Sequence, residues 1–68
     1  MVLIFGKDNC PYTRKATEDY AGRDIDFQYI DVRASRDDMD RMLGYTKGVR
    51  RVPVIVDAGK VIIGFGGT

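Results

Sequence analysis

The only cysteine of the chain, Cys10, is the residue best suited to chemistry. It stands in the stretch DNCPYTRKA, directly before Pro11 and three residues before Thr13, and Lys7 lies three residues earlier. Because proline is favoured at the first position of a helix, this spacing predicts a thiol at a helix start. Free N–H groups and the helix dipole favour the thiolate there. A lone cysteine is more often a small buried hydrophobe, but this position indicates a reactive thiol.

Whether Cys10 is reactive depends on how far its surroundings lower the pKa of the thiol. An ordinary thiol is only about 3% thiolate at neutral pH, and the thiolate is the nucleophile. A helix terminus stabilises a nearby charge by roughly 0.3 to 1 kcal/mol, which is less than one pKa unit. Direct N–H···S hydrogen bonds and the charge of Lys7 would have to supply the rest. Activation of Cys10 is therefore a hypothesis that depends on those contacts.

The composition excludes several classes of function. With 68 residues, the chain predicts one small domain covering residues 1–68. A net charge of +1 gives no field that would favour nucleic acid or an anionic membrane, and the apolar runs are too short to span a membrane. Without histidine and with one cysteine, a single chain lacks the ligands of an ordinary zinc or haem site, so we expect no metal. An unpaired thiol is typical of a cytoplasmic protein.

The first half of the chain predicts a strand, a helix and a second strand. The apolar run Val2 to Phe5 ends at Gly6 and is typical of a strand buried on both faces. The helix would be capped by Asn9 or Cys10 and stopped by Gly22. Its semi-apolar stripe repeats every four residues, at Tyr12, Ala16 and Tyr20. The second strand covers Asp26 to Val32, and the crossover helix makes it parallel to the first.

The second half predicts a helix followed by a hairpin. Ser35 precedes Asp38 by three residues, a short-armed version of the capping box. The inner face of the helix is marked by Met39, Met42 and Leu43, and the helix would end at Gly44 or Gly48. Two apolar runs in VPVIVDAGKVIIG flank Asp57 to Lys60 and predict a hairpin. The order is that of an α/β protein with a four-stranded mixed sheet and two helices.

Two separated motifs resemble those of the glutaredoxins. KDNCPYT is similar to their K-x-x-C-P-Y-C motif, and KGVRRVPVIVDAGKVIIG is similar to their T-G-x-R-T-V-P segment with its strand, hairpin and I-G-G. The resemblance covers nearly all 68 residues. It implies a thioredoxin-like fold, Cys10 as the nucleophile, and Pro53 in the cis form facing the thiol. The residues alone would favour a trans proline that opens an edge strand.

The resemblance also implies a glutathione site. Lys7 would pair with a carboxylate of glutathione, Arg50 would meet another, and Tyr12 would flank the cleft. Val52, before Pro53, would offer its backbone N–H and C=O to the tripeptide as an added strand does. From the residues alone, the alternative is that the basic side chains are solvated charges, which is the commoner fate of exposed basic residues, and that the tyrosine is a partly buried helix residue.

The chain departs from the glutaredoxin pattern at three places. Thr13 stands where dithiol members have their resolving cysteine; its hydroxyl either donates to the thiolate or is an inert part of the first turn. The acidic pair of the family falls on Gly66 and Gly67. The C-terminal helix of the family is missing. These departures leave fold and nucleophile better supported than affinity for glutathione.

The function predicted from the sequence is that of a monothiol thiol–disulfide oxidoreductase. Cys10 would form a mixed disulfide that glutathione or another low-molecular-weight thiol releases, and disulfide-containing proteins would be the substrates. The C-x-x-T motif also resembles small glutaredoxin-like proteins in which selenocysteine occupies the nucleophile position. Two alternatives stay open. One is a [2Fe–2S] carrier bridged by two chains and glutathione. The other is a partner-binding module or homodimer that uses the uncovered sheet.

Overall fold

The computed structural model describes residues 1–66 and contains a four-stranded mixed sheet and two helices. In chain order, the elements are β1 (Val2–Gly6), α1 (Pro11–Gly22), β2 (Phe27–Asp31), α2 (Arg36–Thr46), β3 (Val54–Asp57) and β4 (Lys60–Ile63). The strand order is β2-β1-β3-β4. β1 is parallel to β2 and antiparallel to β3, and β3 is antiparallel to β4. The predicted mixed sheet and its two helices are confirmed.

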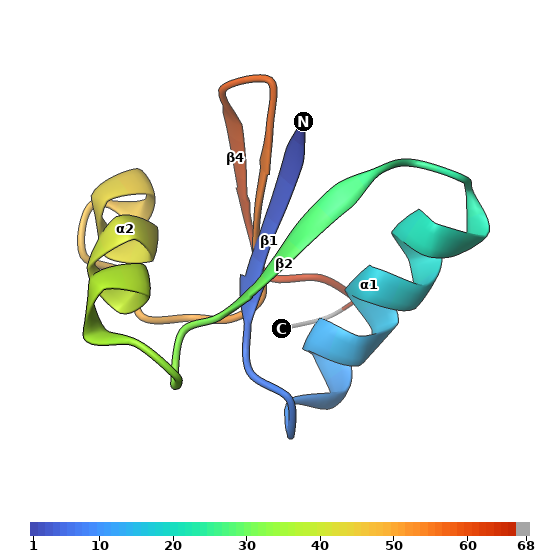
Figure 1. Ribbon diagram of the computed structural model, residues 1–68. Helices are drawn as coiled ribbons and strands as arrows, with labels where there is room; N and C mark the ends of the chain where they lie inside the picture. The colour runs from blue at the N-terminus through green and yellow to red at the C-terminus, as the bar shows by residue number, and fades with distance from the viewer. Residues whose placement is uncertain (67–68) are drawn as a thin grey trace.

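The two helices cover opposite faces of the sheet, and β1 lies between β2 and β3 (Figure 1). Side chains alternate between the faces of a strand, so β1 divides its residues between the helices. Val2 and Ile4 belong to the apolar cluster on the α1 side, whereas Leu3 and Phe5 pack in the cluster on the α2 side. The continuous apolar run of β1 therefore reflects a strand with both faces covered.

Each face of the sheet has its own buried cluster. On the α1 side the buried residues are Val2, Ile4, Ala16, Tyr20 and Ile55. On the α2 side they are Phe5, Ile30, Val32, Met42, Val54 and Val56. The predicted inner face of the second helix is confirmed, because Met42 is fully buried and Met39 and Leu43 pack around it.

Helix α1 begins at Pro11 and ends at Gly22, as expected, but its inner stripe differs from the prediction. The buried positions are Thr13, Ala16 and Tyr20, whereas Tyr12 is half-buried. Thr13 can lie inside because it packs on Gly6: a Cβ added to that glycine would lie within 3.0 Å of three side-chain atoms of the threonine. The spacing does not predict burial of Thr13, the residue after Tyr12, because threonine is usually exposed.

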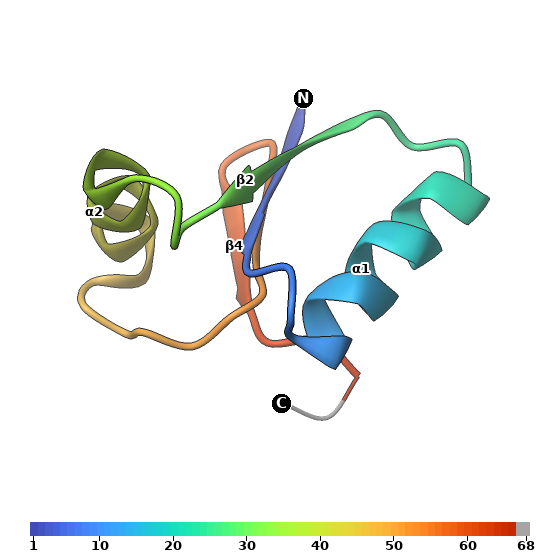
Figure 2. The same ribbon diagram turned by 60° about the horizontal axis from the view of Figure 1, so that its bottom comes forward.

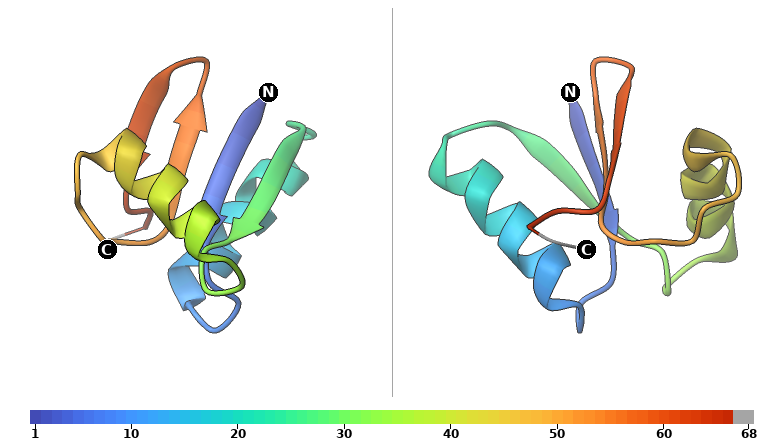
Figure 3. Two further views of the ribbon diagram at one scale, coloured as in Figure 1. Left: turned by 60° about the vertical axis from the view of Figure 1, so that its left-hand side comes forward. Right: turned by 180° about the vertical axis from the view of Figure 1, so that it is seen from behind.

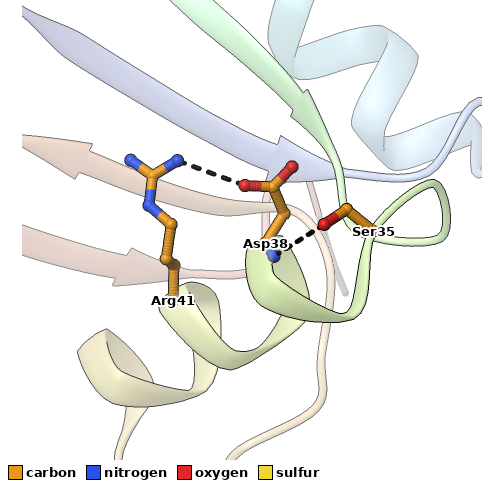
Figure 4. Close-up of polar contacts among 3 residues, drawn as sticks. All are labelled: Ser35, Asp38 and Arg41. Atoms are coloured by element: carbon orange, nitrogen blue, oxygen red, sulfur yellow. Dashed lines mark hydrogen bonds and ion pairs between the residues drawn. The ribbon is translucent and has the colours of Figure 1, made fainter.

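Helix α2 begins with a conventional side-chain cap. Ser35 is the N-cap residue, and its hydroxyl accepts a hydrogen bond from the backbone N–H of Asp38 at 3.4 Å. The reciprocal half of the predicted capping box is wrong, because the Asp38 carboxylate instead accepts from the Arg41 guanidinium at 3.2 Å (Figure 4). The donor to the Asp38 carboxylate is therefore the exposed Arg41, one turn along α2, and not the backbone N–H of Ser35.

Helix α2 does not end at Gly44, which is one of the two predicted end positions. Gly44 lies inside the helix, which continues to Thr46. Lys47 follows in the left-handed conformation, with φ 58°, and the N–H of Gly48 donates to the Leu43 carbonyl at 3.0 Å. The second predicted position, Gly48, is thus the glycine that closes the helix, at φ 96°.

The hairpin and the loop that carries Cys10 lie at opposite ends of β1 (Figure 1). The hairpin turns at Ala58 and Gly59, whose φ values of 50° and 85° match the two-residue turn that suits a twisted hairpin. Asp57 pairs with Val2, at the start of β1. The other end of β3 therefore lies beside the end of β1, from which the chain leads to Cys10.

The segment after β4 turns back toward the first turn of α1 (Figures 2 and 3). The N–H of Gly64 donates to the Pro53 carbonyl at 2.8 Å, and Phe65 packs against the apolar cluster on the α1 side. Gly67, one of the two glycines compared with the acidic pair, lies outside the described residues. Within residues 1–66, neither helix is long and apolar enough to cross a membrane.

Candidate active site

The loop between β1 and α1 places Cys10 at the N-cap of the helix. The chain turns tightly after Gly6, and the N–H of Cys10 donates to the Lys7 carbonyl at 3.1 Å. The Cys10 carbonyl then accepts from the N–H of Arg14 at 3.1 Å, which is the first hydrogen bond of the helix. Pro11 fits at the next position because no helical carbonyl is available for its missing N–H. The thiol is left partly exposed, as a nucleophile requires.

The surroundings of Cys10 favour its charged form. Partial burial by itself raises the pKa of the thiol, but four opposing contributions outweigh burial and lower the pKa below its ordinary value. They are, in decreasing order, hydrogen bonding from the Thr13 N–H, from the Thr13 hydroxyl and from the Tyr12 N–H, and the charge of Lys7. The neutral thiol forms no capping hydrogen bond of its own. These donors therefore act mainly on the thiolate.

Thr13 connects the sulfur to the loop that precedes it. Its side chain is buried, with 3% of its surface exposed. The hydroxyl oxygen accepts from the backbone N–H of Lys7 at 3.4 Å, which leaves the hydroxyl proton for Cys10. Of the two roles that the sequence left open for Thr13, this geometry favours the donor.

A second contact ties the loop to the edge strand. The Tyr29 hydroxyl on β2 donates to the Asp8 carboxylate at 2.7 Å. Burial raises the pKa of Tyr29, and the hydrogen bond to Asp8 and the charges of Asp8, Asp31 and Cys10 raise it further, so the phenol stays protonated as a donor. The two residues are 21 positions apart, and no short motif joins them. Only the parallel pairing of β1 with β2 brings them together.

Pro53 and Val52 lie at the end of the sheet from which the Cys10 loop begins. The Val52–Pro53 peptide bond is cis, and Pro53 is buried. Val54 pairs with Phe5, so Pro53 stands level with the last residue of β1, Gly6. The backbone N–H and C=O of Val52 precede the first paired residue of β3 and take no part in the ladder.

Tyr12 borders the same region from the helix. Its ring is half-buried, and the Lys15 Nζ lies 5.3 Å from the ring centroid. Gly66 lies against the ring, since a Cβ added there would be 3.9 Å from Cδ1 of Tyr12. The segment after β4 therefore reaches from Pro53, through the bond of Gly64, to the first turn of α1. Glycine at position 66 supplies no acidic group to this region.

The predicted basic residues differ in their placement. Lys7 is half-buried and close enough to Cys10 to lower the pKa of the thiol. Arg50 is exposed on the loop between α2 and β3, where it is followed by the exposed Arg51. Neither arginine forms an ion pair within the described part of the chain. The structure thus joins Lys7, Cys10 and Thr13 by direct interactions, whereas it leaves Arg50 on a neighbouring loop.

A groove beside the thiol was not predicted from the sequence. It lies between α1 and β2 and has a volume of about 360 Å³. Its lining comes from the loop, the helix and the strand: Lys7, Asp8, Thr13, Arg14, Thr17, Phe27 and Tyr29. Residues 1–66 contain no group of three or more Cys, Asp or Glu side chains placed to hold a metal ion.

Comparisons with known proteins identify the family. The family model described as glutaredoxin matches residues 2–62. Comparison with curated protein sequences gives no significant match.

Solved structures agree on the fold. A glutaredoxin from Archaeoglobus fulgidus superposes with a TM-score of 0.83 at 23% identity, covering 96% of this chain and 75% of that chain. The glutaredoxin-like protein NrdH-redoxin from Escherichia coli has a TM-score of 0.80 at 20% identity, with coverages of 96% and 83%. A buckwheat glutaredoxin–glutathione complex gives 0.77 at 26% identity; 93% of this chain matches 59% of that longer chain. The chain therefore belongs to the glutaredoxin family and has its thioredoxin-like fold.

Proposed function

We propose that this protein is a monothiol, glutathione-dependent thiol–disulfide oxidoreductase with Cys10 as its nucleophile. The observation that carries this proposal is the partly exposed thiol at the start of α1, whose pKa lies below the ordinary value. Membership of the glutaredoxin family supports the reaction class. The absence of a second cysteine from the chain means that the mixed disulfide must be resolved by an external thiol.

The proposed cycle has two exchange steps at one sulfur. The Cys10 thiolate attacks the glutathione sulfur of a glutathionylated protein; the new Cys10–glutathione bond forms as the old disulfide breaks, and the protein leaves as a thiolate. A glutathione thiolate then attacks the glutathione sulfur of that intermediate. Glutathione disulfide forms, and the Cys10 thiolate returns. The donors around Cys10 assist twice, because a stabilised thiolate is also a better leaving group.

Glutathione would bind between the loop of Cys10 and the segment before β3. The N–H and C=O of Val52, which take no part in the pairing of β1 with β3, suit an added strand. Lys7 and Arg50 would bind the two carboxylates, and Tyr12 would flank the tripeptide. The buckwheat relative, solved as a glutathione complex, supports this choice of thiol. Other low-molecular-weight thiols are the alternative resolving agents, and a reducing compartment such as the cytoplasm would keep Cys10 available.

Intact-mass spectrometry tests the assignment directly. Treatment with glutathione disulfide should add one glutathionyl group to the wild-type chain, and excess glutathione should remove it. The Cys10→Ser variant should show no adduct. Parallel incubations with cystine and coenzyme A disulfide would rank the thiols. A chain that forms no adduct below pH 8, or keeps its adduct in excess glutathione, would contradict the proposal.

A further inference from the structure

The groove between α1 and β2 lies on the opposite side of the Cys10 loop from the proposed glutathione site. β2 and β3 flank β1 on its two sides, and Pro53 directly precedes β3. The groove is lined instead from β2, by Phe27 and Tyr29. It nevertheless adjoins the thiol, because Thr13, which lines it, lies in the first turn of the helix that Cys10 caps. A ligand in this groove would therefore reach the sulfur from the side that glutathione leaves free.

We propose that this groove binds the peptide segment around a substrate's disulfide, taking one bulky apolar side chain and a neighbouring carboxylate. The groove thereby selects acidic, leucine- or aromatic-containing sequences among disulfide substrates. The proposal rests on the exchange reaction at Cys10 for the disulfide, but the binding itself needs no chemistry at the sulfur.

The charge of the groove favours a carboxylate. Lys7 and Arg14 line it, and neither forms an ion pair within residues 1–66. One carboxylate, that of Asp8, also lines the groove, but it already accepts a hydrogen bond from the Tyr29 hydroxyl at 2.7 Å. Arg14 is exposed on α1, so its guanidinium is free to form a bidentate pair with an acidic residue. A basic peptide would instead meet the exposed Arg14 guanidinium, which gives selectivity by repulsion.

The size and lining of the groove favour one large apolar side chain. Phe27 and Tyr29 are both half-buried and expose part of their rings. Thr17 contributes from the helix, and its hydroxyl proton is already donated to the Arg14 carbonyl at 2.9 Å. A volume of about 360 Å³ is at the lower end of the range of roughly 300–1,000 Å³ found for ligand pockets. One side chain with its adjoining backbone fits that space better than a whole cofactor.

A binding experiment on Cys10→Ser protein separates the groove from the redox reaction. Four acetylated hexapeptides with serine in place of cysteine would be titrated into ¹⁵N-labelled protein: one with Glu and Leu flanking the serine, one with Lys and Leu, one with Glu and Ala, and one with Ser and Ala. The Glu–Leu peptide should bind at least fivefold more tightly than each of the other three. Its largest amide shifts should fall at Arg14, Thr17, Phe27 and Tyr29.

Two charge reversals of equal size provide the matched variants. Arg14→Glu lies in the groove, whereas Lys60→Glu lies at the hairpin end of the sheet, away from Cys10. Arg14→Glu should weaken the Glu–Leu peptide at least fivefold and strengthen the Lys–Leu peptide, and Lys60→Glu should change neither by more than twofold. Equal affinities for the four peptides, shifts confined to other surfaces, or equal effects of the two reversals would overturn the inference. Glutathionylation of wild-type Cys10 tests the proposed function separately, and either result can fail without the other.

Discussion

Both helices begin at the end of the sheet where the parallel strands β1 and β2 finish, but the N-termini of the two helices are built differently. Each follows the end of one of the parallel strands β1 and β2. At α2 the hydroxyl of Ser35 caps the helix, and Asp37 and Asp38 lie in the first turn. At α1 the cap is Cys10, which makes no side-chain hydrogen bond, and the first turn contains no acidic residue.

This difference shows how one kind of terminus serves two purposes. The free N–H groups and the dipole at a helix start favour negative charge and oxygen acceptors. At α2 the chain satisfies them with its own serine and aspartates, which stabilises the fold. At α1 they are left for a sulfur that must itself become negative. The same backbone groups thus contribute stability in one helix and lower the pKa of a thiol in the other.

The largest effect is expected when the α1 terminus is converted to the α2 type. Cys10→Ser should abolish thiol–disulfide exchange, with a loss of at least about 10³-fold, because an alcohol with an ordinary pKa is not a nucleophile here. The variant should also raise the free energy of unfolding by roughly 1 kcal/mol, since serine is a good N-cap. Urea denaturation, monitored by circular dichroism, gives the second quantity.

The pH dependence of that stability difference sharpens the comparison. Because the pKa of Cys10 is lowered in the folded chain, the thiolate contributes stability that is complete above the unfolded value of 9.0 and is lost as the pH falls through the folded pKa. The advantage of Cys10→Ser should therefore be largest at pH 6 and smallest near pH 9.5. An advantage that stays constant across this range would mean that the helix terminus does not stabilise the thiolate.

Gly6→Ala should have the next largest effect on stability and on the thiol, because it disturbs the packing of Thr13 against β1. The new methyl group would occupy space filled by the threonine side chain, and overpacking of this kind costs roughly 1–3 kcal/mol. Displacement of the hydroxyl should also raise the pKa of Cys10 toward its ordinary value. Absorbance of the thiolate at 240 nm against pH measures this change.

Gly44→Ala is the matched control in the other helix. A Cβ at this position meets nothing within 4 Å, and the glycine lies inside α2. Alanine there should raise the free energy of unfolding by up to about 1 kcal/mol and leave the thiol titration unchanged. Equal losses of stability in the two variants would show that the contact between residues 6 and 13 has no special role.

Much of the fold could be predicted from local patterns. The buried run of β1, the Pro11 helix start and the Ser35 cap each depend on residues close together in the sequence, and each was predicted correctly. The four-residue recurrence of Tyr12, Ala16 and Tyr20 predicts the inner stripe of α1 correctly at Ala16 and Tyr20, whereas Thr13 is buried in place of Tyr12. Burial of Thr13 depends on Gly6, which carries no side chain, and this relationship appears only when the strand and the helix are packed together.

The site divides in the same way. Cys10 and Lys7 could be singled out from the sequence because a thiol before a proline and a nearby cation are local features. The hydrogen bond between Tyr29 and Asp8, and the groove beneath it, depend on the parallel register of two strands. No spacing in the sequence encodes that contact, so it required the structure.

Thr13→Val should have a smaller effect on the thiol than Gly6→Ala, because it keeps the shape and removes only the hydroxyl. The donor to the sulfur is lost, so the pKa of Cys10 should rise, and the exchange rate at pH 7 should fall about two- to fivefold. The Lys7 N–H also loses its acceptor. Thr13→Ser, which retains the hydroxyl, should restore both the pKa and the rate. A threonine-to-valine change that leaves the pH–rate profile unmoved would assign Thr13 to packing alone.

Ser35→Ala should have the smallest effect on exchange and thereby test the comparison from the other helix. Removal of the hydroxyl that accepts from Asp38 should lower the free energy of unfolding by about 0.5–2 kcal/mol. The thiol titration and the exchange rate should stay within experimental error, because Ser35 caps a different helix on the opposite face of the sheet. The reverse pattern holds for Thr13→Val, in which the thiol changes more than the fold. A shift in the pKa of Cys10 caused by Ser35→Ala would mean that the two helix starts are coupled through β1 and β2, and their roles could then no longer be assigned separately.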